Sequence, residues 1–504
     1  MINNNIRFFS FFIFFSIFLY GSDKNFTVLE NPNSNTIKFS IDELNIEKVD
    51  NLYKIGVDTK SKTIEVGKPE LPIYSFSYGL DPEKEYSIEY KVTKTSVIDD
   101  IEVFPYQPDG ENLNKELIKD YDIYENLKSY PESNISQAVV SMRGYEIMNV
   151  QILPFEYLPE TKKLIVHDEV EISIIQDGYK QNKIFPPTNK KSRVFEKFYN
   201  NLVLHSDFQR EGDYQQPSII YICGDGAINS SGMQLLVEWR KKQGYAVDIV
   251  EIDQIGSSTT SIKNYIENAY DNWENPPEFV GLVGDSGGPI SLPAYTVGSG
   301  GGWGGAYAES DYPYTLMDGP SDIIGDIFVG RLSVRSTSDV YTVANKIIGY
   351  EQAYAGFDWI ENAALVGDPY DSGISTVITN QYIEQIMANY GVQNINTKYS
   401  GSGFDTFMRD EINNGISYLN YRGFYGFSNF NSNDVDALYN GYKLPFIVTL
   451  TCDTGSFQTE ATCIIEDLFR AGSANNPKGG VAVVGTAQPY THTAFNNIVA
   501  MGIF

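Results

Sequence analysis

Two kinds of hydrophobic pattern divide this chain. From about residue 24 to residue 184, apolar and polar residues alternate with a period of two, and short turn clusters such as residues 158–162 interrupt the alternation. This pattern is typical of antiparallel strands that bury one face. We therefore predict an all-β domain, a sandwich or a barrel, over residues 23–184.

From residue 218 onward, short apolar strands alternate with segments whose apolar residues follow helical spacing. Such an alternation predicts parallel sheets covered by helices on both faces. The pattern runs once through residues 217–355 and restarts in residues 361–504, so we predict two related α/β halves. The predicted strands are 218–223, 246–252, 279–283, 327–330, 363–366, 417–421, 446–449 and 480–484. The predicted helices are 232–244, 261–273, 338–351, 374–390, 404–414 and 464–471.

Residues 185–216, between the two patterns, are polar and weakly patterned, and they are basic against an acidic background. Exposed segments of this kind are where proteolytic cleavage concentrates. We predict a linker that carries a processing site, with a plain interdomain tether as the alternative.

The N-terminus has the features of a secretory signal peptide over residues 1–22. Arg7 precedes the apolar run 8–19, and the small residues Gly21 and Ser22 follow it. A membrane anchor is the weaker alternative, because a bilayer span needs about 20 apolar residues. We expect a protein that is secreted or at the cell surface, without a stable membrane span. No terminating element is predicted at Phe504, which suggests a fragment of a longer protein.

Composition narrows the chemistry. The net charge is 37 − 65 = −28, which argues against nucleic acid as a partner. Three cysteines are too few to staple a chain of 504 residues, so a disulfide scaffold is excluded. Three histidines, at positions 167, 205 and 492, limit the options for imidazole chemistry.

Residues 284–289 read Gly-Asp-Ser-Gly-Gly-Pro, the nucleophile motif of chymotrypsin-like serine peptidases. Ser286 would need a histidine base supported by an aspartate, and the upstream histidines stand in other contexts. The flanking segments also alternate helix with strand, whereas that family is built from β-barrels. We predict a turn at a strand end, with Asp285 contacting a helix N-terminus or a cation.

Cys452 is the candidate nucleophile. It comes directly after the carboxyl end of a predicted strand, which is the edge where open α/β sheets bind ligands. The residues Asp-Thr-Gly-Ser that follow favour a tight turn, so the sulfur would project and backbone N–H groups there and near Gly423 could face a substrate oxygen. An inert core cysteine is the alternative.

The segment 217–500 resembles the gingipain-type cysteine peptidases, which have a caspase-like fold. The matching motifs begin at Pro276 (PPEFVGLVGD), Ser310 (SDYPY), Gly415 (GISYLNY) and Leu444 (LPFI, followed by CDTGSF). The segment 24–184 is similar to the propeptide of these enzymes. The resemblance implies an α/β caspase-like catalytic domain preceded by an all-β propeptide domain. It also implies a protein or peptide substrate and a propeptide that acts as an intramolecular partner.

The resemblance places Cys452 on the nucleophile and Asp368 on the residue that orients the catalytic histidine. The family has that histidine in Asn-Tyr-x-Gly-His-Gly, where this chain has Phe424. A phenyl ring cannot accept a thiol proton. His492, which follows the last predicted strand, is the candidate replacement, and a surface-loop histidine is the alternative. The family carries structural calcium, so we expect such an ion without assigned ligands, and no cofactor for catalysis.

Two functions follow. The first is a secreted cysteine endopeptidase made as a zymogen. The second is a catalytically deficient homologue that acts as an extracellular binding protein, in which Phe424, Tyr425 and Phe427 form an aromatic docking surface. The Gly-rich loop 298–305 and the turn after Thr451 could shape a substrate pocket, but neither indicates which side chain it accepts.

Overall fold

The computed structural model describes residues 25–31, 34–57, 61–107, 117–180, 190–208, 211–297, 308–353, 357–457, 462–488 and 491–504. The predicted signal peptide and the Gly-rich loop lie outside these residues. The described residues form two compact units, one of residues 20–215 with 318–326 and one of residues 216–317 with 327–504. Each unit is described separately below.

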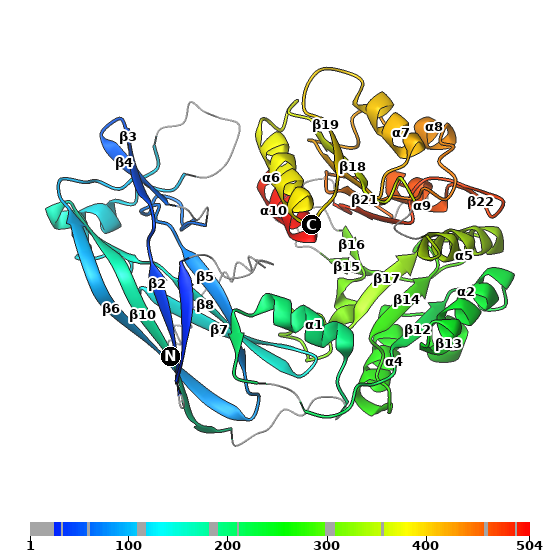
Figure 1. The fold of residues 1–504 in the computed structure, drawn as a ribbon, viewed down its shortest axis with the longest axis horizontal. Helices are drawn as coiled ribbons and strands as arrows, with labels where there is room; N and C mark the ends of the chain where they lie inside the picture. The colour runs from blue at the N-terminus through cyan, green and yellow to red at the C-terminus, as the bar shows by residue number, and fades with distance from the viewer. Residues whose placement is uncertain are drawn as a thin grey trace, which may run out of the picture. The chain divides into compact units, whose positions relative to one another are not determined.

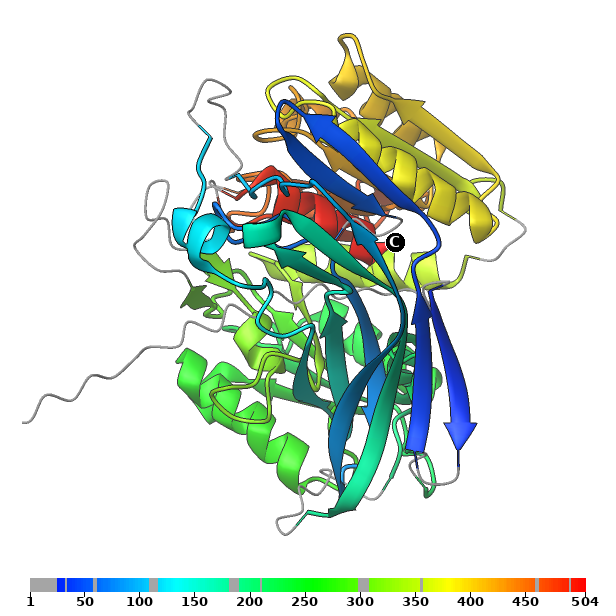
Figure 2. The ribbon, with the colours of Figure 1, turned by 90° about the vertical axis from the view of Figure 1, so that its left-hand side faces the viewer.

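The first unit, the β-rich unit, consists mainly of antiparallel strands (Figure 2, blue to green). One sheet has the order β1 (Phe26–Asn31), β2 (Ser34–Ser40), β10 (Lys163–Tyr179) and β6 (Lys84–Ile98), with β9 (Phe155–Leu158) paired to β10. The other has the order β11 (His205–Ser206), β5 (Tyr74–Leu80), β8 (Tyr145–Ile152) and β7 (Ile135–Met142). The smaller elements are the hairpin β3 (Leu44–Val49) and β4 (Leu52–Val57) and the short helical turns η1 (Asp122–Asn126) and η2 (Pro159–Thr161).

The core of the β-rich unit explains the period of two in its sequence. Alternate residues of β5, among them Tyr74 and Tyr78, are buried against Phe39 of β2 and Ile172 of β10. Burial of each such side chain contributes about 1.5–3 kcal/mol. Because one core joins the inner faces of both sheets, the arrangement is a sandwich, one of the two predicted forms.

The stretch predicted as a linker contains regular structure. Helix α1 (Arg193–Leu202) begins after Ser192, whose hydroxyl accepts a hydrogen bond from the Phe195 amide at 3.2 Å. Phe195 and Tyr199 are buried, and the Tyr199 ring stacks on Tyr145 with centroids 4.5 Å apart. This helix and β11 therefore belong to the β-rich unit. The spacing of Phe195 and Tyr199 is the helical signal in this polar stretch.

The second unit, the α/β unit, contains two parallel sheets, as predicted. The first has the order β13 (Ala246–Glu251), β12 (Ser218–Cys223), β14 (Phe279–Val283) and β17 (Phe328–Leu332). Helices α2 (Ser231–Lys242) and α5 (Thr337–Glu351) cover one face, and α3 (Ile252–Ile255) and α4 (Thr259–Asn272) pack on the other (Figure 1). The small elements of this half are β15 (Tyr295–Val297), β16 (Ala308–Ser310) and η3 (Tyr312–Thr315).

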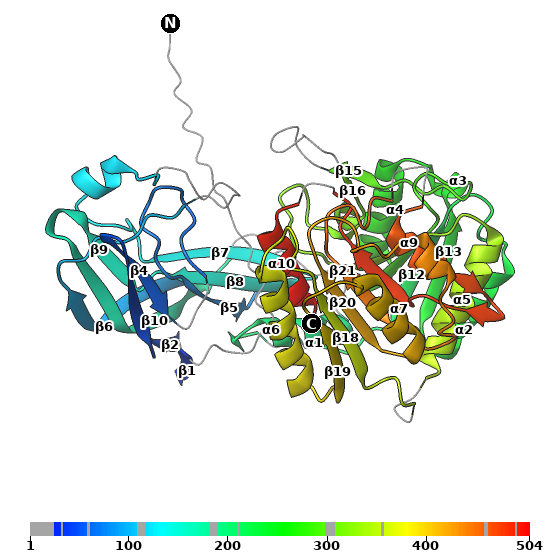
Figure 3. The same cartoon turned by 90° about the horizontal axis from the view of Figure 1, so that it is seen from above.

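The second sheet has the order β19 (Asn394–Lys398), β18 (Asn362–Gly367), β20 (Tyr418–Arg422), β21 (Phe446–Thr449) and β24 (Ala482–Gly485). Helices α6 (Ser375–Asn389) and α10 (Thr493–Ile503) lie side by side on one face (Figure 3, yellow and red). Helices α7 (Phe404–Asn414), α8 (Ser432–Asp436) and α9 (Ile464–Arg470) cover the other. The hairpin β22 (Gly472–Ser473) and β23 (Asn476–Pro477) follows α9.

Five elements of this half were not predicted: β19, α8, β22, β23 and α10. Strand β19 is a polar edge strand without a fully buried residue, so it lacks the apolar run of its neighbours. Helix α10 fills the last residues, where no terminating element was expected, and it buries Asn496, Asn497 and Ala500. Its inward face is largely polar, which hides the helical period.

A buried polar cluster joins the two halves of the α/β unit. The Asp285 carboxylate lies 3.6 Å from both Arg335 and Arg470. From α5, the Lys346 ammonium donates to the Phe469 carbonyl of α9 at 2.6 Å. The Gly-Asp-Ser-Gly-Gly-Pro motif is thus part of a structural joint, and the predicted cation partners of Asp285 are guanidinium groups. Ser286 donates its hydroxyl hydrogen to the Phe457 carbonyl at 2.8 Å.

Among the helices of the described residues, none has both the length and the apolar character that crossing a bilayer requires.

Candidate active site

The candidate residues meet at the carboxyl edge of the second sheet. Asp368 follows β18, Phe424 follows β20 and Cys452 follows β21, and these three strands are adjacent and parallel. Tyr425 pairs with Cys452 in an isolated parallel bridge, in which the Gly426 amide donates to the Cys452 carbonyl at 3.0 Å. The parallel topology therefore places Cys452 and Asp368 at one edge, as the sequence predicts.

The turn after Cys452 holds an unusual backbone conformation. Asp453 has a φ of 65°, in the left-handed region, which costs a non-glycine residue about 1 kcal/mol. Its carboxylate accepts hydrogen bonds from the Tyr425 hydroxyl and the Ser456 hydroxyl, each at 2.6 Å. These contacts fix the turn and with it the position of the preceding sulfur.

The Cys452 sulfur lies 3.3 Å from both the carbonyl oxygen and the hydroxyl oxygen of Thr491. That hydroxyl oxygen also accepts a hydrogen bond from the Asn496 amide at 2.7 Å. Cys452 is half-buried. The other thiols differ: burial in the first half raises the pKa of Cys223 to about 12, and burial at the start of α9 also raises the pKa of Cys463.

Asp368 holds the loop after β20. Its carboxylate accepts hydrogen bonds from the Ser428 hydroxyl and, at 2.9 Å, from the Tyr370 amide. The Tyr421 hydroxyl donates in turn to the Ser428 oxygen at 2.8 Å. Within the described residues no imidazole is among these partners, so the carboxylate orients hydroxyl groups where the family orients a histidine.

Phe424 and Tyr425 present exposed rings, with 47% and 56% of their surface accessible. Phe427 is 4% exposed and packs edge-on against Tyr421, with centroids 4.7 Å apart. The expectation of a docking surface formed by three aromatic residues is therefore wrong for Phe427, which belongs to the core. Two exposed rings remain.

His492 is the N-cap residue of α10. Its Nδ1 accepts the Ala494 amide hydrogen at 3.1 Å, and its exposed ring lies edge-on to Phe495. Within the described residues the hydrogen-bond partners of the Cys452 sulfur belong to Thr491 and not to His492. Because Nδ1 accepts the Ala494 amide hydrogen, the ring carries its own proton on Nε2 and has no free lone pair for a thiol proton in this arrangement.

The other histidines belong to the β-rich unit. The His167 Nδ1 lies 2.9 Å from the Tyr90 hydroxyl, and burial lowers the pKa of this imidazole. The His205 Nε2 lies 3.9 Å from an Asp207 carboxylate oxygen. Both side chains have local structural contacts.

Arg422, which the sequence analysis did not single out, contacts Thr451, the residue before Cys452. It is the last residue of β20 and is 0% exposed. Its guanidinium donates to the Asn497 amide oxygen at 2.9 Å, the Thr493 carbonyl at 3.3 Å and the Thr451 hydroxyl at 3.4 Å. The available signal was a charged residue at the end of an otherwise buried strand.

Two backbone amides near Cys452 already donate hydrogen bonds to carbonyl groups of the chain. The Asp453 amide donates to the Gln488 carbonyl at 3.2 Å, and the Gly455 amide donates to the Thr486 carbonyl at 2.9 Å. Neither amide is free for a substrate oxygen in this arrangement, and the Gly423 amide remains one candidate for the predicted oxyanion role. A Cβ there would lie 2.1 Å from the Tyr421 hydroxyl, so this position requires glycine.

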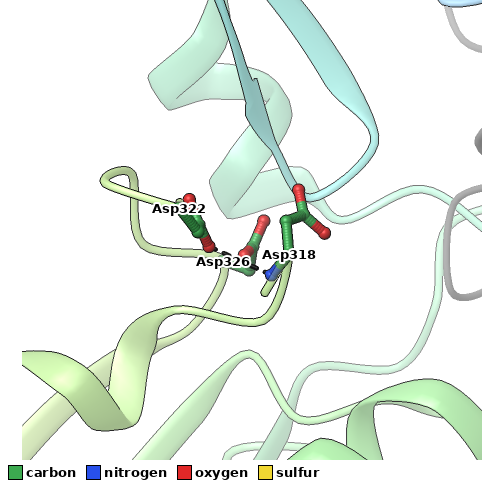
Figure 4. Close-up of side chains that lie close together, drawn as sticks. All are labelled: Asp318, Asp322 and Asp326. Atoms are coloured by element: carbon green, nitrogen blue, oxygen red, sulfur yellow. Dashed lines mark hydrogen bonds between the residues drawn. The ribbon is translucent and has the colours of Figure 1, made fainter. Parts of the chain in front are cut away.

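In the β-rich unit, the carboxylates of Asp318, Asp322 and Asp326 each offer an oxygen within 4.8 Å of the others (Figure 4). Carboxylate oxygens are the ligands that calcium prefers. The chain's own donors also use this cluster, however. Asp322 accepts the Asp318 amide at 3.0 Å, and Asp326 accepts the amide of Arg143. The calcium expected from the resemblance therefore stays without assigned ligands.

A β-sandwich unit and a unit of two parallel α/β halves define a class of architecture: an all-β propeptide domain and a caspase-like α/β domain, as the resemblance implied. The chain belongs to peptidase family C25, whose model matches residues 213–504. The model of the C25 propeptide matches residues 19–208, a span that includes α1 and β11.

Similarity to individual proteins agrees with this family. Gingipain R1 of Porphyromonas gingivalis is 25% identical over 502 residues, which are 92% of this chain and 48% of that protein. Gingipain R2 of the same species is 25% identical over 87% of this chain and 62% of its own length. The chain thus spans about half the length of the first relative. A solved complex of the RgpB pro- and mature domains of P. gingivalis has a TM-score of 0.50 and 25% identity, and the match covers 56% of this chain and 67% of that one.

Proposed function

We propose that this protein is a secreted cysteine endopeptidase made as a zymogen, with Cys452 as its nucleophile. One observation carries the proposal: Cys452 follows β21 at the carboxyl edge of the second sheet, where its side chain is half-buried. The predicted signal peptide supports export. The propeptide domain supports latency, and we assign it as the intramolecular partner of the C25 domain.

In this mechanism the Cys452 sulfur attacks the carbonyl carbon of a peptide bond, and the Gly423 amide stabilises the developing oxyanion. For acid–base catalysis, the His492 ring would first release the Ala494 amide, which its Nδ1 accepts. It would then take the Cys452 thiol proton as the sulfur attacks and give that proton to the leaving amine. Asp368 acts indirectly, since its carboxylate fixes the loop after β20 through Ser428.

Labelling with a peptidyl acyloxymethyl ketone tests the nucleophile. We expect one adduct, located at Cys452 by mass spectrometry, and no adduct in Cys452→Ala. Cys463→Ser is the matched control, because it removes another half-buried thiol and should retain the label. An adduct spread over Cys223 and Cys463, or none in the processed protein, would contradict the proposal.

The second candidate is the catalytically deficient binding protein. Two observations favour it: Phe424 stands exposed at the family's histidine position, and the Asp368 carboxylate is bonded to Ser428. This candidate predicts that unmodified peptides bind without cleavage and that Phe424→Ala weakens binding by about tenfold, the loss of a well-placed aromatic contact. Phe357→Ala, which removes another exposed ring, should leave binding unchanged.

A further inference from the structure

We propose that Arg422 supplies the positive charge that the missing histidine would provide, and that it holds the Cys452 sulfur as a reactive thiolate. This inference rests on the proposed function, because it assumes that Cys452 is the nucleophile. Arg422 is a positioning residue: it acts through the sulfur and not on the substrate.

The contacts of Arg422 leave its charge without a carboxylate partner. Its hydrogen bonds go to a hydroxyl, a carbonyl and a side-chain amide, all of them neutral groups. Within the described residues it forms no ion pair, although it is 0% exposed. An isolated buried charge is costly. An anionic sulfur would provide the missing counter-charge.

Arg422 and Cys452 also share their surroundings. The guanidinium contacts Thr451, the residue before Cys452, and Thr493, the first residue of α10. The sulfur contacts Thr491, two residues before that helix begins. Burial lowers the pKa of Arg422 to about 10, and a negative charge at Cys452 acts in the opposite direction. The guanidinium therefore stays protonated at neutral pH.

The other charged or titratable groups near the sulfur are committed elsewhere. Asp453 accepts from Tyr425 and Ser456. The carboxylate of Asp368 accepts from Ser428 and the Tyr370 amide. His492, at the start of α10, uses its Nδ1 for the helix cap. Within the described residues, Arg422 is thus a buried cation beside this strand end, and its printed hydrogen bonds all go to neutral groups.

This arrangement predicts a defined reactivity. With a p-nitrophenyl ester, the thiolate forms a C–S bond to the acyl carbon, the C–O bond breaks, and the electron pair leaves on p-nitrophenolate without a proton. A peptide amine needs a proton to leave, and a guanidinium is a poor acid for this purpose. We therefore expect a burst of about one equivalent of p-nitrophenolate followed by slow turnover, because thioester hydrolysis needs an activated water molecule.

The test is the rate of Cys452 alkylation by iodoacetamide, followed by mass spectrometry at about pH 6.5 and about pH 9.5. Arg422→Met should slow alkylation about tenfold at the lower pH, because a buried positive charge near the sulfur is lost, and should match the wild type at the higher pH. Arg422→Lys should restore most of the rate. Arg409→Met is the matched control and should change neither rate. It removes a cation of α7 that is paired with Asp434 of α8.

Asn497→Asp provides an independent variant if Arg422→Met does not fold. In this variant a carboxylate of nearly equal shape replaces the Asn497 side-chain amide that accepts the Arg422 Nε hydrogen. The new negative charge neutralises the positive charge of the guanidinium. Alkylation at the lower pH should again slow. Unchanged rates in folded Arg422→Met or in Asn497→Asp would overturn the role of Arg422 and leave Cys452 as nucleophile. A wild type whose Cys452 resists alkylation at both pH values would overturn the proposed function as well.

Discussion

The two halves of the α/β unit use the same four residues at the same place for different purposes. Leu-Val-Gly-Asp ends a central strand in each half, at residues 282–285 and 365–368. In the first half, Asp285 is buried between Arg335 and Arg470 and joins the halves. In the second half, Asp368 faces an open edge beside Cys452 and holds a loop through Ser428.

The difference shows which side chains leave the end of a strand accessible. Topology alone brings an aspartate to the sheet edge in both halves. In the first half, Arg335 from the segment after β17 and Arg470 of α9 cover the edge beside Asp285. In the second half, the neighbouring loops supply neutral hydroxyls and a thiol, so the edge stays accessible. The predictions below use matched changes at the two edges.

Replacing Asp285 should have the largest effect. Asp285→Asn removes the negative charge that faces Arg335 and Arg470, and breaking a buried ion pair on one side typically costs about 3–5 kcal/mol. We expect a loss of this size in the free energy of unfolding, measured by urea denaturation. Ser286→Ala, at the adjacent position, removes one hydrogen bond and should cost about 1 kcal/mol. Equal effects of the two changes would contradict the structural joint.

Restoring the family's histidine at position 424 should increase the rate of peptide cleavage. Phe424→His places an imidazole next to the bridge between Tyr425 and Cys452. A general acid–base group contributes about 10²–10⁴-fold to rate. We expect at least about 10²-fold faster cleavage of a peptide substrate, with little change in stability because Phe424 is exposed. Phe424→Asn, which is polar but cannot transfer the proton, is the control and should remain as slow as the wild type.

The sequence predicted the elements that bury apolar faces and missed those that do not. Strands β18, β20 and β21 were predicted because each is a buried apolar run, and their parallel order then placed Cys452 and Asp368 at one edge. Helix α10 was missed because its inward residues include Asn496 and Asn497. The contacts of the Cys452 sulfur with Thr491, just before this helix, could not be predicted for the same reason.

Arg422 shows this limit most clearly. Its burial depends on α10, since Asn497 and Thr493 of that helix accept its hydrogen bonds. A charged residue at the end of a strand usually reaches solvent, and only the packing of α10 against this edge reverses that expectation. The charge at the strand end is visible in the sequence, but its burial under α10 is not.

Lys346 offers a test of the contact between the halves through pH. Burial lowers the pKa of its ammonium from 10.5 to about 7. Between these values the unfolded chain binds the proton and the folded protein does not, so folding becomes more favourable as pH rises. Below about pH 7 the full cost of burial remains. We expect the free energy of unfolding of the wild type, relative to Lys346→Met, to rise by about 1.4 kcal/mol per pH unit across this window.

The measurement is urea denaturation of both proteins at about pH 7.5 and about pH 9.5. Lys443→Met is the matched control, because Lys443 is more exposed and donates only to the Asn414 carbonyl. Its difference from the wild type should not depend on pH. A pH-independent difference for Lys346→Met would mean that this side chain stays charged in the folded protein.

The smallest effect is expected at the open edge itself. Asp368→Asn keeps one oxygen that can accept the Tyr370 amide, while the new amide group can donate to the Ser428 oxygen after that hydroxyl rotates. We therefore expect a loss of about 1 kcal/mol, the value of a single rearranged hydrogen bond, against the larger loss for the same change at Asp285. Urea denaturation of the two asparagine variants side by side measures the contrast. A loss at Asp368 as large as that at Asp285 would show that the second edge is also a structural joint, and the distinction between the two strand ends would not hold.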